Sequence, residues 1–173
     1  MNEIEIIPID DTQVAKLQTI SKQTFQETFA PVNTAENMTR YLEENFTTEK
    51  MLKELVNPEC LFFFAVKSNE VIGYLKLNIG ATQTELQESN TLEIERIYVQ
   101  QVFHGKKVGQ VLYEKAISTA KELNVDYVWL GVWEENKRAI NFYTKNGFVP
   151  FDKHYFKLGD DVQTDIMMRL ILK

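Results

Sequence analysis

Apolar residues recur along the chain with two different periods, and each period predicts one kind of element. Between Asp11 and Phe29 they return every three or four positions, which is typical of an amphipathic helix capped by Asp11 or Thr12. Residues 34–46 and 47–56 show the same spacing, and each segment begins with threonine followed by acidic residues. The first part of the chain therefore carries three predicted helices.

Short apolar runs between turn residues predict the strands. Residues 60–80 contain two such runs around Ser68 and Asn69, which indicates a hairpin, whereas the polar residues 81–90 are expected to form a loop. The predicted strands lie in residues 4–9, on either side of Ser68 and Asn69, in residues 91–99, in residues 125–133, and on either side of Gly159, Asp160 and Asp161 in residues 148–172.

One pair of strands is expected to be parallel. Residues 92–99 and 127–133 flank a predicted helix over residues 107–123, and a helical connection of this kind joins parallel strands. A last helix over residues 135–146 ends at Gly147, which suits a left-handed cap. The order predicts a single α/β domain over residues 1–173, with a mixed, mostly antiparallel sheet of about seven strands.

The composition is ordinary for a globular protein. Hydrophobic residues make up 44% of the 173 residues, no apolar run of about 18 residues occurs, and the first residues lack a signal-peptide pattern. We therefore expect a cytoplasmic protein that does not enter a membrane. The net charge of -6 argues against a nucleic-acid partner, which would require a basic face, and leaves cationic partners open.

Cysteine and histidine are too sparse to suggest a metal site. Cys60 is the single cysteine, and its apolar surroundings in sequence predict a buried residue rather than a nucleophile. His104 and His154 are the two histidines, and neither belongs to a group with zinc-like spacing. We expect no metal.

The turn HGKKVG, residues 104–109, is the first candidate site because it follows a predicted strand and precedes a predicted helix. A helix start offers unpaired backbone N–H groups to phosphate oxygens, and Gly109 has no Cβ to block their approach. An ordinary connection between strand and helix also uses glycine, so both interpretations stay open at this point. The candidate amides are those of Lys107, Val108, Gly109 and Gln110.

A second candidate site lies in the helix predicted over residues 135–146. Asn136, Ala139 and Tyr143 are spaced by three and four residues, which places them on one stripe of the helix. A capping role for Asn136 and a core position for Tyr143 are the simpler interpretations. They do not explain why both polar groups share one stripe.

These features together resemble a known family. The turn after a strand, the second strand of the parallel pair and the pattern N-x-x-A-x-x-F-Y-x-K-x-G-F from Asn136 to Phe148 are similar to the GNAT superfamily of acetyl-coenzyme A-dependent N-acetyltransferases. Over essentially the whole chain, LEIERIYV, VWLGVWEENKRAINFY and GDDVQTD resemble the bacterial spermidine/spermine acetyltransferases of the Pai type. The resemblance implies a GNAT fold with helices on both faces of the sheet and a parallel pair whose strands splay apart.

The resemblance also implies acetyl-coenzyme A as cosubstrate. Its pyrophosphate would lie on the turn, and its pantetheine arm would lie between the splayed strands, paired with the backbone of the first strand. Gly131 fits a place where a ligand approaches the second strand closely. The residues implied in binding are Ile97, Tyr98, Val99, His104, Gly105, Lys106, Lys107, Val108, Gly109, Gln110, Asn136, Arg138 and Tyr143.

The turn departs from the usual family pattern. Where the family has Arg or Gln, then glycine, then glycine or alanine, this chain has His104, Lys107 and Gly109. Because the cradle works through backbone amides, Lys107 fits if its backbone accepts the required angles, at some strain if φ is positive. Lys106 and Lys107 either add positive charge near the pyrophosphate or form a solvated pair.

The reaction requires a proton acceptor, because a primary amine with a pKa of about 10.4 is protonated at neutral pH. A period of two places Glu93, Glu95, Ile97 and Val99 on one face of their strand and Arg96 on the other. Either glutamate is a candidate base, directly or through water, with Glu93 preferred. An ion pair with Arg96 is the alternative role for either one.

The resemblance assigns the remaining chemical roles. Tyr143 would protonate the leaving thiolate, as its counterpart does in the family. The amide of Val99 or of its neighbour would stabilise the tetrahedral oxyanion.

Acidic and aromatic residues favour a polycationic acceptor, although a solvated face and core packing also explain them. The residues concerned are Glu85, Glu88, Glu93, Glu95, Asp160 and Asp161, with Phe29, Tyr41 and Tyr155 as aromatic walls. The resemblance over the whole chain implies acetylation of a primary amine of spermidine or spermine by direct attack in a ternary complex, and the acidic residues supply a physical reason for this acceptor. A peptide or protein N-acetyltransferase and a non-catalytic acyl-coenzyme A sensor remain alternatives. The oligomeric state is not fixed by the sequence, and a homodimer is compatible with it.

Overall fold

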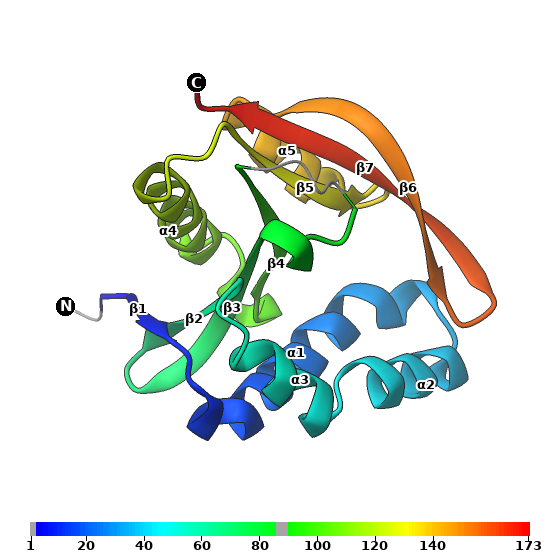
Figure 1. The fold of residues 1–173 in the computed structure, drawn as a ribbon. Coiled ribbons are helices and arrows are strands. Elements are labelled where there is room, and N and C mark those ends of the chain that lie inside the picture. Colours follow the sequence, from blue (N-terminus) through cyan, green and yellow to red (C-terminus); the bar gives the residue numbers. More distant parts are fainter. Residues whose placement is uncertain (1–2, 86–89) are drawn as a thin grey trace.

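The computed structural model describes residues 3–85 and 90–173, and within them it contains a seven-stranded mixed sheet (Figure 1). The strand order is β1-β2-β3-β4-β5-β7-β6, and every neighbouring pair is antiparallel except β4 with β5. The predicted fold class is confirmed. The strands are β1 (Glu5–Pro8), β2 (Cys60–Lys67), β3 (Glu70–Ile79), β4 (Thr91–Val99), β5 (Tyr127–Trp133), β6 (Val149–Leu158) and β7 (Asp161–Ile171).

Helices cover both faces of the sheet, as expected. One hydrophobic core joins the sheet to α4 and α5 through residues such as Leu112 and Phe142, and a second joins it to α1, α2 and α3 through residues such as Leu17, Met38 and Met51. Figure 1 shows α1, α2 and α3 grouped together, apart from α4 and α5. The helices are α1 (Val14–Phe29), α2 (Ala35–Asn45), α3 (Thr48–Leu55), α4 (Val108–Glu122) and α5 (Lys137–Lys145).

Local chemistry explains most element boundaries. Thr34 and Thr47 accept hydrogen bonds from backbone N–H groups in the first turns of α2 and α3, so both predicted threonine caps are present. Ser68 and Asn69 have φ of 51° and 65°, which are the angles of a type I′ hairpin turn. The predicted cap of the first helix is wrong, because Asp10 caps a 3-10 turn, η1 (Asp11–Gln13), that leads into α1.

Cys60 is buried at the start of β2, and burial raises the pKa of its thiol. The thiol is therefore protonated near neutral pH, which agrees with a packing role.

Candidate active site

The parallel strands separate near their middle. Both β4 and β5 continue well beyond their last paired position, and no described residue of β4 after Glu93 pairs with β5. The predicted splay of the parallel pair is thus confirmed, and it leaves an opening in the sheet between β4 and β5. The paired positions are Thr91 with Tyr127, Leu92 with Val128, and Glu93 with Trp129.

Two cavities lie beside this opening. The turn cavity, of about 640 Å³, is lined by the end of β4, the turn before α4, and α5. The central cavity, of about 290 Å³, is lined by β4, β5, β6 and β7 together with α1 and α2. The two cavities share Thr28, Ile97, Tyr98, Asn136, Ala139 and Tyr143.

The residues predicted to hold the cosubstrate gather around the turn cavity, although they come from three separate stretches of sequence. Lys106 is the exception: its ammonium group lies 5.3 Å from the centre of the Phe103 ring, and the residue does not line the cavity. The predicted residues that line it are Ile97, Tyr98, Val99, His104, Gly105, Lys107, Val108, Gly109, Gln110, Asn136, Arg138 and Tyr143.

The turn before α4 has the backbone of an anion cradle. Lys107 precedes the helix in the left-handed conformation with φ of 66°, which strains a residue other than glycine, and Gly105 has φ of 77°. Apart from its chain neighbours and the backbone of α4, a Cβ placed on Gly109 would meet no atom of the described residues within 4 Å. The first-turn N–H groups of α4 have no acceptor within the helix and lie at the positive end of the helix dipole.

Two side chains fix the edges of the turn cavity. The Nε2 atom of His104 lies 2.8 Å from the carbonyl oxygen of Val99 and ties the turn to the end of β4. The Asn136 side chain accepts a hydrogen bond of 3.1 Å from the Ala139 N–H and caps α5. Asn136 therefore has the simpler capping role and also lines both cavities.

Tyr143 lies at the junction of the two cavities. Its ring is buried against Phe142 and Phe148, with centroid distances of 5.3 and 5.5 Å. Burial, and to a lesser extent Tyr113, raises the pKa of the Tyr143 phenol well above its usual range. The phenol therefore carries its proton at neutral pH, which a proton donor requires.

The alternation predicted for β4 is wrong beyond Glu93. A bulge shifts the register, so that Lys76 of β3 pairs with Arg96 while Leu77 pairs with Ile94, and Glu95 is the extra residue. Ile97 and Val99 pack on the α4 side, whereas Tyr98 packs in the core formed with α1, α2 and α3. Arg96 faces this second side as well, with its guanidinium 5.0 Å from the centre of the Phe46 ring.

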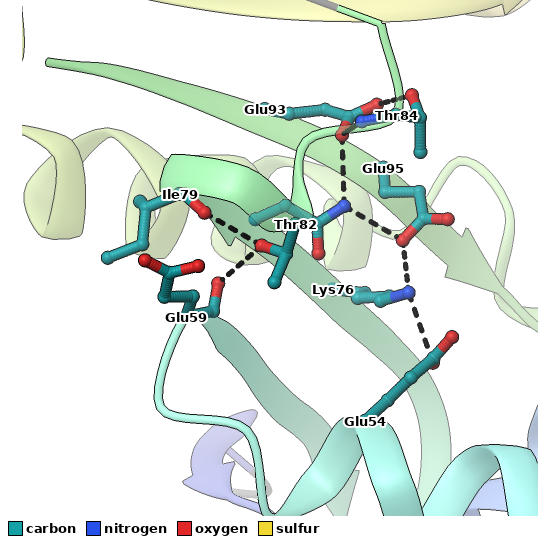
Figure 2. Close-up of polar contacts among 9 residues, drawn as sticks. Glu54, Glu59, Lys76, Ile79, Thr82, Thr84, Glu93 and Glu95 are labelled. Carbon is teal, nitrogen blue, oxygen red and sulfur yellow. Dashed lines mark hydrogen bonds and ion pairs between the residues drawn. The ribbon is translucent and has the colours of Figure 1, made fainter. Parts of the chain in front are cut away.

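Glu93 is a buried carboxylate that lines the central cavity, with 3% of its surface exposed. Its Oε1 accepts hydrogen bonds of 2.9 Å from Asn78 Nδ2 and from the Thr84 N–H, and its Oε2 accepts one from the Thr84 hydroxyl (Figure 2). Burial raises the pKa of the Glu93 carboxyl, and these hydrogen bonds offset part of that rise.

Glu95 has the opposite electrostatic environment. It forms an ion pair with Lys76, which also contacts Glu54 at 3.0 Å, and it accepts a hydrogen bond of 3.0 Å from Asn78 Nδ2 (Figure 2). Burial acts to raise the pKa of Glu95, but the positive charges of Arg96 and Lys76 outweigh it and hold the pKa below its usual value. One asparagine amide thus joins two carboxylates with opposite pKa shifts.

Aromatic side chains line the central cavity. Phe29 and Tyr41, both predicted as walls, line it, whereas Tyr155 is 72% exposed and does not. The prediction for Tyr155 is wrong because its neighbours in β6, His154 and Phe156, face the cavity instead. Sequence alone did not fix which side of β6 turns inward.

Two further acidic residues, Glu85 and Asp165, line the central cavity. Glu85 forms an ion pair with His154, while the Asp165 carboxylate forms no hydrogen bond or ion pair with any described residue. Burial raises the pKa of Asp165, with His154 acting against and Glu85 adding to the rise. The predicted Glu88 lies outside the described residues. Asp160 and Asp161 do not line the cavity.

The Asp161 carboxylate instead accepts a hydrogen bond of 3.1 Å from Asn33 and holds the β6–β7 hairpin against η2 (Ala30–Val32). This contact gives Asp161 a structural role in the described structure.

Sequence reasoning missed several residues that shape this site. Lys76 and Asn78 alternate with apolar residues along β3, and two polar residues on a strand that proves to be central were a usable signal. Thr84 and Asp165 had no such signal in the sequence. Thr84 lies at the cavity because of the path of its loop, and Asp165 because β7 pairs with β5.

The site contains no group of three or more potential metal ligands within the described part of the chain.

Among the described residues, no helix is long and apolar enough to cross a membrane.

Comparisons with known proteins agree with this geometry. The model of the acetyltransferase (GNAT) family matches residues 22–148. An uncharacterized N-acetyltransferase of Lactobacillus delbrueckii subsp. lactis is 37% identical over 172 residues, which cover 99% of each chain. The spermidine N(1)-acetyltransferase of Thermoplasma acidophilum is 28% identical, over 84% of this chain and 87% of the relative.

Two further proteins match over most of this chain. The crystal structure of PaiA N-acetyltransferase from Thermoplasma acidophilum in complex with coenzyme A superposes with a TM-score of 0.81, at 25% identity, and covers 98% of this chain and 99% of that one. An N-alpha-acetyltransferase of Sulfurisphaera tokodaii is 31% identical over 69% of this chain and 76% of the relative.

Proposed function

The chain belongs to the GNAT family of acetyltransferases, which use acetyl-coenzyme A as cosubstrate, and we propose that it acetylates a primary amine of a polyamine such as spermidine or spermine. The observation that carries the proposal is the meeting of two cavities at Tyr143. One cavity has a helix N-terminus, and the other has carboxylates and aromatic rings. The thioester can therefore occupy one cavity and the amine the other, and the two groups meet beside Tyr143.

The turn cavity receives the cosubstrate in this proposal. The N–H groups of Val108, Gly109 and Gln110 bind the pyrophosphate, and the left-handed backbone at Lys107 directs them outward. The pantetheine arm runs along Ile97 to Val99, where β4 has no strand beside it on the β5 side. The acetyl group then arrives beside Tyr143.

The central cavity receives the acceptor. Four described carboxylates line it, those of Glu85, Glu93, Glu95 and Asp165, and their negative charge favours an amine with more than one positive charge. Aromatic side chains such as Phe29 and Tyr41 provide an apolar wall for the aliphatic spacers between amines. The spermidine acetyltransferase among the relatives supports this acceptor.

The proposed reaction is direct attack within a ternary complex. Glu93 accepts the proton of the ammonium group, and the neutral amine attacks the thioester carbonyl. An amide at or next to Val99 stabilises the oxyanion. As the C–S bond breaks, Tyr143 protonates the departing thiolate, and the second proton lost by the attacking nitrogen restores the Tyr143 phenol. Glu95, held charged by Lys76, contributes a fixed negative charge that attracts the acceptor.

A calorimetric titration with acetyl-coenzyme A, followed by thiol detection with and without spermidine, tests the proposal. We expect binding of acetyl-coenzyme A and thiol release that depends on spermidine. Binding without release for any amine or peptide would instead identify a non-catalytic sensor. The N-alpha-acetyltransferase among the relatives makes a peptide N-terminus the second acceptor to assay.

A further inference from the structure

The buried Glu93 carboxylate lines the central cavity together with a hydroxyl group that is bonded to it, that of Thr84. Glu93 is 3% exposed, whereas Thr84, which lines the same cavity, is an exposed residue. The Thr84 side chain donates a hydrogen bond to Oε2 of Glu93. Figure 2 shows the two side chains facing each other between β4 and the segment that follows η3 (Gly80–Thr82).

The two carboxylate oxygens of Glu93 have different partners. Oε1 accepts hydrogen bonds from Asn78 and from the Thr84 backbone, which fix its position. Oε2 has the Thr84 hydroxyl as its hydrogen-bond donor among the described residues. A hydroxyl group both donates and accepts, so it can pass a proton on, which neither amide donor at Oε1 does.

We propose that the Thr84 hydroxyl relays the proton of the acceptor's ammonium group to Glu93. The proposal rests on the proposed function. In one concerted step an ammonium N–H bond breaks and its proton binds Oγ1 of Thr84, while the hydroxyl proton of Thr84 moves to Oε2 of Glu93. The products are a neutral amine, an intact threonine and a neutral glutamic acid. Water later takes the proton from Glu93 by the reverse route.

The charged surroundings of Glu93 are compatible with this transfer. On its own strand Glu95 adds negative charge, but Glu95 is paired with Lys76 of β3. Its hydrogen-bond and register partners among the described residues are uncharged: Asn78 of β3, Thr84, and Trp129, which pairs with Glu93 in register from β5. The amine in the cavity is therefore the cation from which Glu93 gains a proton.

Thr84→Val and Thr84→Ser form a matched pair that tests the relay. Valine keeps the shape and the backbone N–H that binds Glu93 but removes the hydroxyl, whereas serine keeps the hydroxyl. At neutral pH we expect Thr84→Val to lower kcat/KM for spermidine about 10- to 100-fold and Thr84→Ser to lower it about threefold or less. The affinity for acetyl-coenzyme A should be unchanged in both.

The pH profile separates a relay from a structural role. The loss of kcat/KM in Thr84→Val should become smaller as the pH approaches the amine pKa of about 10.4, because the free amine then needs no proton acceptor. Combining Thr84→Val with Glu93→Gln should add little to the loss from Glu93→Gln alone. An equal loss of kcat/KM in Thr84→Val and Thr84→Ser would overturn the relay, and so would a loss in Thr84→Val that does not change with pH. Absence of spermidine acetylation by the wild type would instead remove the proposed function.

Discussion

Glu93 and Trp129 are the last residues at which the parallel strands β4 and β5 pair. Beyond them both strands continue apart, and the two cavities open on either side of the separation. The pairing therefore fixes where a ligand can lie between strands, and it places a buried carboxylate directly beside that point.

Gly109→Val should weaken binding of acetyl-coenzyme A at least about 10-fold, or about 1.4 kcal/mol, because the added side chain fills the space before the first turn of α4. The fold should persist, since a Cβ at this position meets no described atom within 4 Å. Isothermal titration calorimetry measures the affinity. Lys106→Ala is the control and should have a much smaller effect, because Lys106 lies over Phe103 outside the cavity. Equal affinities for both variants and the wild type would exclude the turn as the cradle.

Tyr143→Phe should lower kcat about 10- to 1000-fold while leaving the Kd for acetyl-coenzyme A nearly unchanged. The ring remains packed against Phe142 and Phe148, so thermal stability should change little. Pre-steady-state and steady-state rates of thiol release measure the effect. A fully active variant would limit Tyr143 to a packing role.

Lys76→Met should destabilise the protein by about 2–4 kcal/mol, because it leaves Glu95 without its ion-pair partner in a mostly buried site. Denaturant unfolding at neutral pH measures this change. Glu54→Gln is the matched control on the other side of Lys76, and its effect should be smaller because the Glu54 side chain is 34% exposed.

The same variant should change how stability depends on pH. In the wild type the pKa of Glu95 is lower in the folded state than in the unfolded state, so its contribution is complete above the unfolded pKa of about 4.3 and is lost as the pH falls. Without Lys76 the folded pKa rises, and this contribution shrinks or reverses. Unfolding curves at acidic and neutral pH should therefore differ less in Lys76→Met than in the wild type.

Asp165→Asn should raise KM for spermidine about 10-fold and change kcat much less, because this carboxylate lines the central cavity without an ion-pair partner among the described residues. The wild-type kcat/KM should also fall as ionic strength rises, since salt screens the attraction. Asp160→Asn, outside the cavity, is the control. Equal KM values for both variants and the wild type would remove Asp165 from acceptor binding.

Much of the fold was predictable because its signals are local. Threonine caps, the turn at Ser68 and Asn69, and the strand–helix–strand unit around α4 each follow from short stretches of sequence. The residues predicted to hold the cosubstrate came from equally short stretches, and all of them except Lys106 line the turn cavity.

The acceptor side was harder because it depends on pairing between distant strands. The bulge at Glu95 changes which residues of β4 face each side of the sheet. The sequence of β4 does not predict the bulge, because the shift is a property of its pairing with β3. Asp165 reaches the cavity because β7 pairs with β5, and Thr84 because the segment after η3 returns to Glu93. Such contacts become visible only once the sheet order is known.

The most direct test of the account is a competition between acceptors in one reaction. Equal concentrations of spermidine, butylamine and a peptide with a free N-terminus are incubated with acetyl-coenzyme A and the protein, and the acetylated products are quantified by mass spectrometry. The account predicts that acetylspermidine forms fastest and that this advantage declines with added salt. Preferential acetylation of the peptide would contradict the polyamine assignment and leave the acetyltransferase assignment in place.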